Sequence, residues 1–598
     1  MKSILLSRRD LDFLLFEWLR VDELTKRERF AEHSRETFAD VLDLCEQLAT
    51  RYFAPHNKKS DSHEPTFDGT HVSVLPEAKE ALDAFARADL VGMSMDHELG
   101  GAQLPTTVAG AAFAWLQAAN VSTTGYLMLT WANANLLAKF GSSAQVDAFV
   151  RPMLAGRFSG TMCLSETQAG SSLADIVTRA EPQRDGTYRL FGSKMWISGG
   201  DHELTENIVH LVLAKIPGGR AGTKGISLFV VPKFLVDADG GIGERNDVVL
   251  AGLNHKMGYR GITNTVLNFG EGGFRPNGEP GAVGYLVGEP HRGITYMFHM
   301  MNEARLGVGM GAVALGYTGY LKSLEYARVR PQGRPVTAKD PSTAQVPIIE
   351  HPDVKRMLLA QKAYVEGALA LALYCARLVD LQHSAESDEE LDSTTLLLDI
   401  LTPVAKSWPS QWCLEANSLA IQVHGGYGYT REYDVEQHYR DNRLNPIHEG
   451  TQGIQSLDLL GRKVVQRNGA SLVALGKALG ESISAGAGLG DEPAELAAQL
   501  DSAWQRLVGV TTAMFGSGDV EAALANSVVY LEAFGHIVIA WMWLEQVLAA
   551  HGQTGDFYDG KRQAARYFFR YELPKTAAQL DLLESLDRTT LEMRGAWF

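Results

Sequence analysis

A carboxylate that stands between a histidine and a glycine is the residue of this chain best suited to proton chemistry. Residues 447–454 read Ile-His-Glu-Gly-Thr-Gln-Gly-Ile, a pattern that predicts a loop leading into a helix. Glycine lets a ligand approach the backbone closely, and the first turn of a helix has free N–H groups. Glu449 is therefore well placed to remove a proton beside a carbonyl group whose oxygen those N–H groups bind.

A glycine-rich segment precedes this loop in the sequence. Residues 422–428 read Gln-Val-His-Gly-Gly-Tyr-Gly. Gly-Gly-x-Gly followed by Glu-Gly-Thr resembles the C-terminal signature of the acyl-CoA dehydrogenases. The resemblance implies that Glu449 is the catalytic base, that Thr451 contacts FAD and that Gly450 lies at the substrate.

A second motif lies at 162–173, with the sequence Met-Cys-Leu-Ser-Glu-Thr-Gln-Ala-Gly-Ser-Ser-Leu. It predicts a strand that ends in a turn, where backbone amides and small hydroxyl groups can face a flavin ring; an ordinary β-turn is the alternative. The motif is similar to the family's first signature, with Thr167 in place of the usual Pro and Ser172 in place of the usual Asp. The resemblance assigns three residues to FAD: Met162, Leu164 and Ser165. It assigns Ser171 to the pantetheine part of the substrate.

The third motif is Lys-Met-Trp-Ile-Ser-Gly-Gly at 194–200. An aromatic ring beside a hydroxyl at the end of a strand suits flavin stacking and hydrogen bonding. On its own, Trp196 would be read as a core residue. The family resemblance implies instead that Trp196 covers the flavin and that the Ser198 hydroxyl reaches it.

The fourth motif is Asn-Glu-Ala-Arg at 302–305, on a predicted helix. The resemblance places Arg305 in the active site, where it helps to orient acyl-CoA, and it also assigns Asn302 to the substrate. Some family members carry the base at the position of Ala304. Glu303 is one residue away, about 100° around the helix, and is expected to point elsewhere. Glu449 is therefore the predicted base.

A basic segment, Arg-Val-Arg-Pro-Gln-Gly-Arg at 328–334, is similar to the segment that in this family reaches the FAD of a neighbouring subunit. Arg330 and Gln332 would contact the pyrophosphate and adenosine, since a charge-assisted hydrogen bond to phosphate is favourable. A solvated basic helix end is the alternative. The partner's side of this contact would come from three residues: Gln422, Gly425 and Gly426. The resemblance therefore implies a homodimer.

Length and composition bound the class of protein. The chain has 598 residues, more than one hydrophobic core usually organises, and 45% hydrophobic and 21% charged residues are typical of a folded globular protein. The net charge of −16 argues against nucleic acid or an anionic membrane as partner. Four scattered cysteines predict neither a disulfide framework nor a zinc site. Because no signal peptide is visible, a cytoplasmic location is expected.

Hydrophobic periodicity divides the chain into helical and strand-rich parts. Helical spacing is present in six segments: 38–52, 77–90, 109–140, 294–328, 352–381 and 396–423. Short apolar runs predict five strands: 158–165, 188–197, 208–214, 226–231 and 265–269. Asp185-Gly186 predicts a hairpin turn, and 335–347 predicts an exposed loop.

This order of elements resembles the acyl-CoA dehydrogenase fold over residues 37–465. The expected fold class is mainly α with a central β-domain. Its predicted domains are a helical domain, a β-domain and a four-helix domain: 37–156, 157–287 and 288–465. An N-terminal extension (1–36) and an additional helical domain (466–598) flank them. The sequence at 453–463 is similar to a subgroup of longer bacterial members, the one that includes 3-methylmercaptopropionyl-CoA dehydrogenases.

The two flanking parts have their own patterns. Residues 6–30 predict an amphipathic element packed on the body, and the last part is entered through a glycine-rich segment at 480–490. Residues 527–550 are apolar enough to suggest a membrane helix. Acidic residues at 532 and 545 interrupt this segment and would be costly in a bilayer. A buried helix of a bundle is the prediction, with no integral membrane segment.

A glycine pattern at 307–312, Gly-Val-Gly-Met-Gly-Ala, matches the dinucleotide-binding fingerprint. That fingerprint requires a preceding strand and a βαβ unit, whereas here a predicted helix precedes it. These glycines are expected to permit close packing of helices.

The assembled motifs imply an FAD-dependent acyl-CoA dehydrogenase. Glu449 would remove the α-proton of acyl-CoA, the β-hydrogen would leave as hydride to flavin, and trans-2-enoyl-CoA would form. An electron-transfer flavoprotein would then accept the electrons. Two alternatives are an acyl-CoA oxidase that uses oxygen and a DNA-associated flavoprotein of the same fold. Ten basic against sixteen acidic residues at 466–598 disfavour DNA binding.

The acyl chain that the enzyme accepts stays open. His448 stands where many members have Tyr, and Gly453 stands where a common form has Gln. Both replacements alter the pocket near the thioester. His448 is either a contact for a polar or sulfur-containing acyl group or a tolerated variant.

Overall fold

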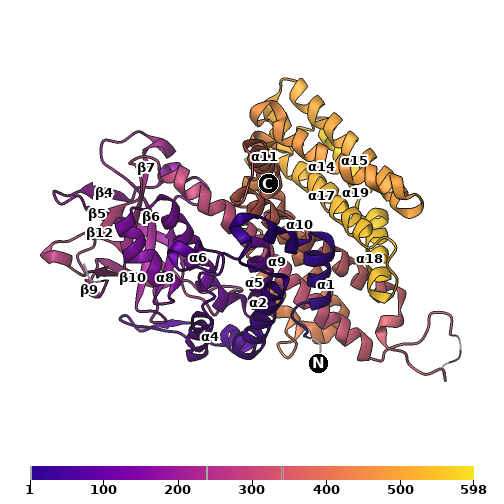
Figure 1. Cartoon of the computed structure of the whole chain (residues 1–598), viewed down its shortest axis with the longest axis horizontal. Coiled ribbons are helices and arrows are strands. Elements are labelled where there is room, and N and C mark those ends of the chain that lie inside the picture. The colour runs from indigo at the N-terminus through magenta and orange to yellow at the C-terminus, as the bar shows by residue number, and fades with distance from the viewer. Residues whose placement is uncertain (1–2, 238–239, 339, 341) are drawn as a thin grey trace. The chain divides into compact units, whose positions relative to one another are not determined.

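The computed structural model describes residues 3–237, 240–338, 340 and 342–598 (Figure 1). The chain forms two compact units. The helical unit consists of Met1–Arg35, Pro105–Ala114 and Arg305–Phe598, and the sheet unit consists of Glu36–Leu104 and Trp115–Ala304. The predicted fold class, mainly α with a β-region in the middle of the chain, is confirmed.

Within its described residues, the sheet unit is organised around an eight-stranded sheet. Its strands are β3 (Phe158–Cys163), β4 (Arg179–Pro182), β5 (Tyr188–Ser198), β6 (Asn207–Lys215), β7 (Ile226–Pro232), β10 (Val248–Leu253), β11 (Asn264–Phe269) and β12 (Ala282–Leu286). They lie in the order β10-β11-β5-β12-β7-β6-β3, and β4 pairs with both β5 and β6. β3 and β6 are parallel. Apolar side chains on the strands form a buried core: Cys163, Leu190, Val212, Phe229 and Leu267.

All five predicted strands are present, with ends shifted by one or two residues. The predicted turn at Asp185-Gly186 joins β4 to β5, and the Asp185 carboxylate accepts a hydrogen bond from the Thr187 N–H at 3.0 Å. The sequence did not predict β4, β10, β12 or two small hairpins. Those hairpins are β1 (Thr66–Phe67) with β2 (Val72–Ser73), and β8 (Phe234–Val236) with β9 (Ile242–Arg245). β4 and β9 are rich in polar residues, and the hairpin strands β1, β2 and β8 have only two or three residues each, so none of them has an apolar pattern that could be read. β10 and β12 are mostly apolar and were missed although their composition suits a strand.

The helices of the sheet unit include α2 (Arg35–Leu48), α4 (Pro76–Arg87) and α6 (Val121–Phe140). The segment 109–140, expected to have one helical pattern, is two helices, because α5 (Thr106–Ala119) ends before Asn120. Asn120 is extended, and its side chain accepts the Thr123 N–H at 3.0 Å as the cap of α6. Asn133 of α6 donates hydrogen bonds to the carbonyls of Thr161 and Val209 in the sheet.

The helical unit is built on α9 (Gly293–Val329, from Arg305 onward), α10 (Pro352–His383) and α11 (Asp388–His424). α9 and α11 approach closely, because a Cβ added to Gly309 would lie 2.1 Å from the Ala405 carbonyl oxygen. Gly316 meets Cys413 of α11 in the same way. The prediction that glycines of this segment permit close helix packing is therefore confirmed for Gly309.

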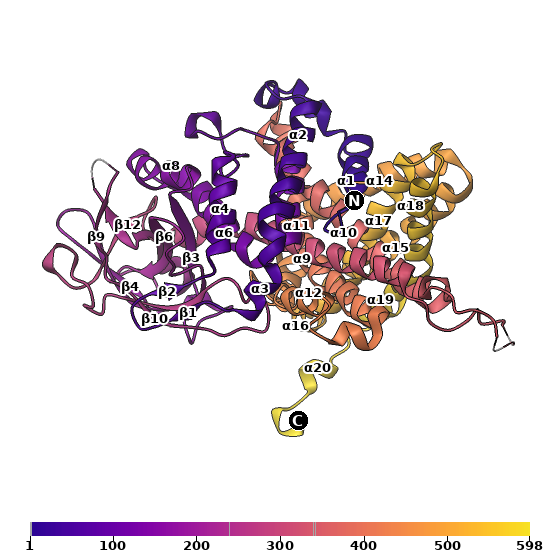
Figure 2. The same ribbon diagram turned by 90° about the horizontal axis from the view of Figure 1, so that it is seen from below.

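The last part of the chain adds a further group of helices to this unit. They are α14 (Ala470–Leu489), α15 (Asp491–Gly516), α16 (Val520–Ala525), α17 (Ser527–Ala549), α18 (Asp556–Tyr567), α19 (Lys575–Glu584) and α20 (Thr589–Glu592). Figures 1 and 2 both show α14, α15 and α17 lying together. The glycine-rich segment 480–490 is not a linker, since it forms the end of α14 and only Gly490 leaves the helix.

α17 is long and apolar enough to cross a membrane, but most of it is buried inside the unit. Trp541 and Trp543 are among its fully or almost fully buried side chains. The prediction of a buried bundle helix is confirmed.

The segment 6–30 is a series of short helical turns that begins with α1 (Arg8–Asp12) and contributes to the same unit. Leu11, Phe13 and Leu14 are fully buried. The Phe13 ring meets Phe557 of α18 edge-on at 5.5 Å, and the indole N–H of Trp18 donates to Glu545 of α17 at 2.8 Å. The predicted amphipathic element is therefore confirmed and packs on the C-terminal helices.

Candidate active site

Glu449 lies in a tight loop between α12 (Val435–Asn442) and α13 (Gln452–Asp458). Its φ is 52° and that of Gly450 is 94°, so two consecutive residues have a left-handed backbone. The Gln455 side chain donates to the Glu449 carbonyl at 3.0 Å, and Thr451 caps α13 by accepting the Ile454 N–H. The loop thus reaches a helix start, as the sequence predicted.

The Glu449 carboxyl group is partly buried, and this decides its acidity. Burial raises its pKa, while the positive charges of Lys406 and Arg305 lower it in part. The net direction is upward, toward the range of a general base that works near neutral pH.

The backbone around Glu449 also offers a hydrogen-bond donor. Within the described residues, no acceptor takes the N–H of Glu449. An N–H group with no partner can hold a carbonyl oxygen on which negative charge develops. The loop therefore carries, on one residue, a carboxyl group of raised pKa and a backbone N–H that is available to a ligand.

Arg305 is buried on α9 and pairs with Asp458 of α13 at 2.8 Å. Asp458 also pairs with Arg462. Because its charge lowers the pKa of Glu449, Arg305 belongs to the electrostatic surroundings of the loop. One turn earlier, in the sheet unit, Asn302 has a partly exposed side chain and Glu303 accepts a hydrogen bond from Asn135 at 3.0 Å.

The second group of predicted residues lies at the ends of β3 and β5 in the sheet unit. Met162 is a buried residue of β3, and Leu164 and Ser165 follow that strand with partly exposed side chains. The Ser165 carbonyl accepts a hydrogen bond from the Met195 N–H of β5 at 3.0 Å, which brings the two motifs together. Ser171 is exposed further along the same turn.

A buried ion pair shapes this turn. Nζ of Lys194 lies 2.9 Å from a Glu166 carboxylate oxygen and donates to the Leu164 carbonyl at 3.0 Å. The N–H groups of Val177 and Thr178 donate to the same carboxylate. Burial alone would raise the pKa of Glu166, but these partners, with Lys194 first among them, lower it to about 2. Glu166 is therefore an anion that fixes the loop after β3.

Trp196 is an exposed aromatic residue in a strand, with 58% of its surface accessible and a φ of 65°. A register shift between β11 and β5 occurs beside it, so the strand bulges and turns this ring outward. Ser198, two residues on, accepts a hydrogen bond from the Asn264 side chain at 3.2 Å. An exposed indole beside a hydroxyl is the arrangement that a planar ring system would cover.

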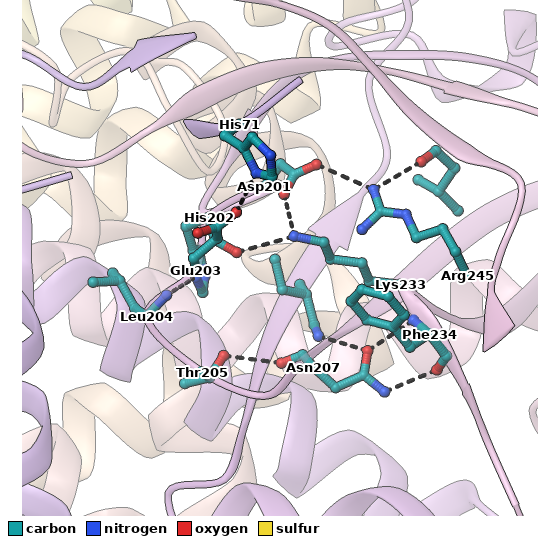
Figure 3. Close-up of polar contacts among 12 residues, drawn as sticks. His71, Asp201, His202, Glu203, Leu204, Thr205, Asn207, Lys233, Phe234 and Arg245 are labelled. Atoms are coloured by element: carbon teal, nitrogen blue, oxygen red, sulfur yellow. Dashed lines mark hydrogen bonds and ion pairs between the residues drawn. The ribbon is translucent and has the colours of Figure 1, made fainter. Parts of the chain in front are cut away.

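A polar network fixes the loop that follows β5 (Figure 3). Asp201 pairs with Lys233 and lies 3.4 Å from the Arg245 guanidinium, and Lys233 also donates to the His202 carbonyl at 3.0 Å. Burial, followed by the Lys233 charge, lowers the pKa of His202 to about 3, so the imidazole is neutral. The network anchors the strand end that carries Trp196.

The basic segment at 328–334, which is predicted to contact the pyrophosphate and adenosine of FAD, begins where α9 ends. The Arg330 guanidinium lies over the ring of Tyr427, 5.4 Å from its centroid, in the same chain. Gly425, which has a φ of 63°, and Gly426 come just before that tyrosine, and a Cβ added to either would meet no heavy atom within 4 Å. Two further predicted contacts have exposed side chains: Gln332 and Gln422. A partner subunit's contribution to this segment stays a prediction.

The structure thus collects the predicted residues into groups within each unit. The loop at 443–451 that carries Glu449, called the base loop below, forms one group with Arg305. The basic segment at 328–334 and the glycine-rich segment at 422–428 form another, and both groups are in the helical unit. The ends of β3 and β5 form the third, in the sheet unit. Sequence reasoning missed Lys406 and the pair of Glu166 with Lys194, because buried charges far apart in sequence carry no local signal.

Family profiles match the chain in four consecutive stretches. The N-terminal domain of acyl-CoA dehydrogenase matches residues 36–157, and its middle domain matches 161–271. Its C-terminal domain matches 291–464, and an acetyl-CoA dehydrogenase C-terminal-like domain matches 476–594.

Individual relatives match almost the whole chain. It is 35% identical to 3-methylmercaptopropionyl-CoA dehydrogenase of Ruegeria pomeroyi over 94% of this chain and 95% of the relative. It is also 35% identical to a broad-specificity linear acyl-CoA dehydrogenase of Mycobacterium tuberculosis over 99% of each chain. Among solved structures, the FAD complex of an acyl-CoA dehydrogenase from Bacillus anthracis is similar in fold, with a TM-score of 0.72 and 20% identity, covering 98% of this chain and 95% of that one.

Proposed function

Because this chain belongs to the acyl-CoA dehydrogenase family, we propose that it oxidises acyl-CoA thioesters to trans-2-enoyl-CoA with FAD as its cofactor. The observation that carries the proposal is Glu449, a partly buried carboxyl group of raised pKa beside an unpartnered backbone N–H. A base and an oxyanion donor on one residue suit removal of a proton next to a thioester carbonyl.

The residues present suit FAD. The exposed indole of Trp196 and the Ser198 hydroxyl would lie against the isoalloxazine, together with the backbone at Leu164 and Ser165. Arg330, with Gly425 and Gly426, would hold the pyrophosphate, since a guanidinium and an open glycine backbone both accommodate phosphate. The chemistry that FAD supplies when bound is the acceptance of a hydride from the β-carbon of the substrate.

Glu449 would act in two ways on a bound thioester. Its N–H would bind the thioester oxygen, which makes the α-hydrogen more acidic, and its carboxylate would remove that hydrogen as a proton. The positive charges of Lys406 and Arg305 would favour the ionised, proton-accepting form of the carboxyl group. Packing of substrate over the loop would exclude water, which strengthens each of these interactions.

The substrates we propose are linear acyl-CoA thioesters, including short ones that carry a polar or sulfur substituent. The names of the two relatives described above support this class. We also propose that an electron-transfer flavoprotein accepts the electrons and that the working protein is a homodimer, in which one chain's Arg330 segment reaches the other's FAD.

The decisive variant is Glu449→Gln, which removes the base but keeps the size of the side chain. It is expected to retain yellow, FAD-bound protein, because none of the proposed FAD contacts changes. Mixing with acyl-CoA under anaerobic conditions should then cause no bleaching at 450 nm, whereas the wild type bleaches rapidly. Bleaching of the variant at the wild-type rate would refute the assignment.

The electron acceptor needs a separate measurement. Turnover with electron-transfer flavoprotein and little hydrogen peroxide in air is the result expected of a dehydrogenase. Peroxide formed in proportion to product without any added acceptor would instead support the oxidase alternative.

A further inference from the structure

Lys406 is a buried lysine that points at the base loop. It lies on α11 with no exposed surface, and its Nζ donates to the Gly450 carbonyl at 2.7 Å. Within the described residues, this carbonyl is its one hydrogen-bond partner. A fully buried ammonium with a single neutral acceptor is costly, because its remaining N–H groups have lost water without replacement.

The charges around Lys406 explain why it can be kept there. Glu449 attracts it and Arg305, on α9, repels it, while burial is the largest effect and lowers its pKa to about 7. His448, on the same loop as Glu449, is neutral, because burial and then the Lys406 charge lower its pKa to about 3. Arg305 is already paired with Asp458 of α13, so Glu449 is the carboxylate that interacts with Lys406.

We propose that Lys406 is a positioning residue for Glu449, which holds the loop through the Gly450 carbonyl and keeps the carboxyl group ionised when substrate covers it. This inference rests on the proposed function. It gives the lysine two separable effects, one through its hydrogen bond and one through its charge.

The hydrogen bond acts on the backbone. Glu449 and Gly450 both have left-handed φ values, and a non-glycine residue there is held only by its surroundings. Lys406 donates a hydrogen bond to the Gly450 carbonyl, and the Gln455 side chain donates one to the Glu449 carbonyl. Together these two contacts fix the peptide that orients the base.

The charge acts on protonation. A cation near a carboxyl group favours its ionised form, commonly by one or more pKa units at short range. The rate of flavin reduction should rise with pH as Glu449 ionises. Loss of the Lys406 charge should increase the midpoint of this rise by about 1 pH unit. A purely structural lysine would change the amount of folded protein without moving this pH profile.

Two variants separate the effects. Lys406→Met removes both the charge and the donor, and Lys406→Gln removes the charge but keeps a donor near the Gly450 carbonyl. Both should move the pH profile of anaerobic flavin reduction upward. Lys406→Met should also reduce the rate at the high-pH plateau by about tenfold to a hundredfold, since a displacement of about 1 Å at a reacting group can cost a hundredfold. Lys406→Gln should recover part of this loss.

Lys463 offers a matched control. It is also a buried lysine of the helical unit, but its Nζ pairs with Asp399 at 2.7 Å, whereas that of Lys406 donates to the Gly450 carbonyl. Lys463→Met is expected to leave the pH profile where the wild type has it. If Lys406→Met and Lys406→Gln are folded, bind FAD and keep the wild-type profile, the proposal is overturned.

A second measurement does not depend on turnover. The pKa of Lys406 is lower in the folded than in the unfolded chain, so the unfolded chain binds more protons between about pH 7 and pH 10. The wild type should therefore gain stability relative to Lys406→Met as pH rises through this range, by thermal unfolding. A constant difference would argue against a buried charged lysine. If wild-type protein is not reduced by acyl-CoA, the proposed function fails while this stability test still reports on Lys406.

Discussion

Two residues of the candidate site have a backbone that only glycine adopts without strain. Glu449 and Trp196 have φ values of 52° and 65°. Each such conformation costs on the order of 1–3 kcal/mol, and strain of this kind concentrates at functional sites. In both places a buried charged group lies close by, Lys406 beside the first and the pair of Lys194 with Glu166 before the second. At both positions, a buried charged group therefore helps to hold the strained backbone in place.

The raised pKa of Glu449 predicts an effect on stability as well as on activity. Below about pH 4.5 the carboxyl group is protonated in both the folded and the unfolded chain. As pH rises toward the folded pKa, the unfolded chain ionises first, so the free energy of unfolding falls. Glu449→Gln removes this loss and should therefore be more stable than the wild type at pH 8.

Thermal unfolding of the apo-protein at pH 8 and pH 5 measures this difference. The gain of Glu449→Gln should shrink at the lower pH. A variant that melts below wild type at pH 8 would mean that the carboxylate stabilises the fold, in contradiction to the direction of its pKa.

At the scale of single residues, the sequence predicted Glu449 as the candidate base but did not predict the charged groups around it. Glu449, Trp196 and Ser198 stand in short motifs whose spacing is local, so they could be recognised. Lys406 precedes the loop it supports by more than forty residues, and nothing beside it in the sequence distinguishes it from a surface lysine. Only the packing of α11 against the loop reveals it.

At the scale of the elements, the close packing of α9 on α11 depends on a single glycine, Gly309. Gly309 lies against the Ala405 carbonyl, so any side chain at this position must push the helices apart. Glycine is otherwise unfavourable in a helix by about 1 kcal/mol relative to alanine. The close approach therefore outweighs helix propensity at this position.

Gly309→Ala should destabilise the protein by about 1–3 kcal/mol, the usual cost of overpacking a tight core. Gly480, in the middle of α14, is a matched control, because a Cβ there would meet no heavy atom within 4 Å. Gly480→Ala should stabilise the protein by about 0.5–1 kcal/mol. Chemical denaturation of both variants gives the comparison, and equal effects would show that backbone approach does not matter at α9.

Long helices and central strands were predictable, while short elements were not. The strands β5, β6 and β7 are apolar enough for their period to be read. β4, with the sequence Arg-Ala-Glu-Pro, is defined by its pairing with β5 and β6 and not by its own residues. The break at Asn120 was missed because apolar residues continue on both sides, and only the cap ends one helix and begins the next.

At the scale of the whole chain, the N-terminal extension and the C-terminal helices share one buried charge cluster. Lys561 of α18 pairs with Asp10 of the extension and with Glu366 of α10, at 2.8 Å for the latter. The Tyr317 hydroxyl of α9 donates to Asp10 at 2.9 Å. All of these groups are buried, so the extension is part of the core of the helical unit.

Lys561→Met leaves Asp10 buried without its cation, a change that typically costs about 3–5 kcal/mol. The melting temperature of the helical unit should fall by several degrees, because a loss of this size is a large part of the stability of a folded unit. Arg506→Met is the control, since Arg506 forms exposed pairs with Asp581 and Glu584 that are worth at most about 1 kcal/mol. Equal melting temperatures for the two variants would show that the buried cluster does not stabilise the packing of the N-terminal extension on the C-terminal helices.

The pairing of Phe13 with Phe557 sets an order of events during translation. At about 5–20 residues per second, a ribosome releases the second ring roughly half a minute to two minutes after the first. Throughout that interval the apolar side chains of the leading segment have no permanent cover. Nascent chains should therefore bind chaperones that recognise exposed apolar segments. The helical unit can complete its packing only after α18 has been synthesised.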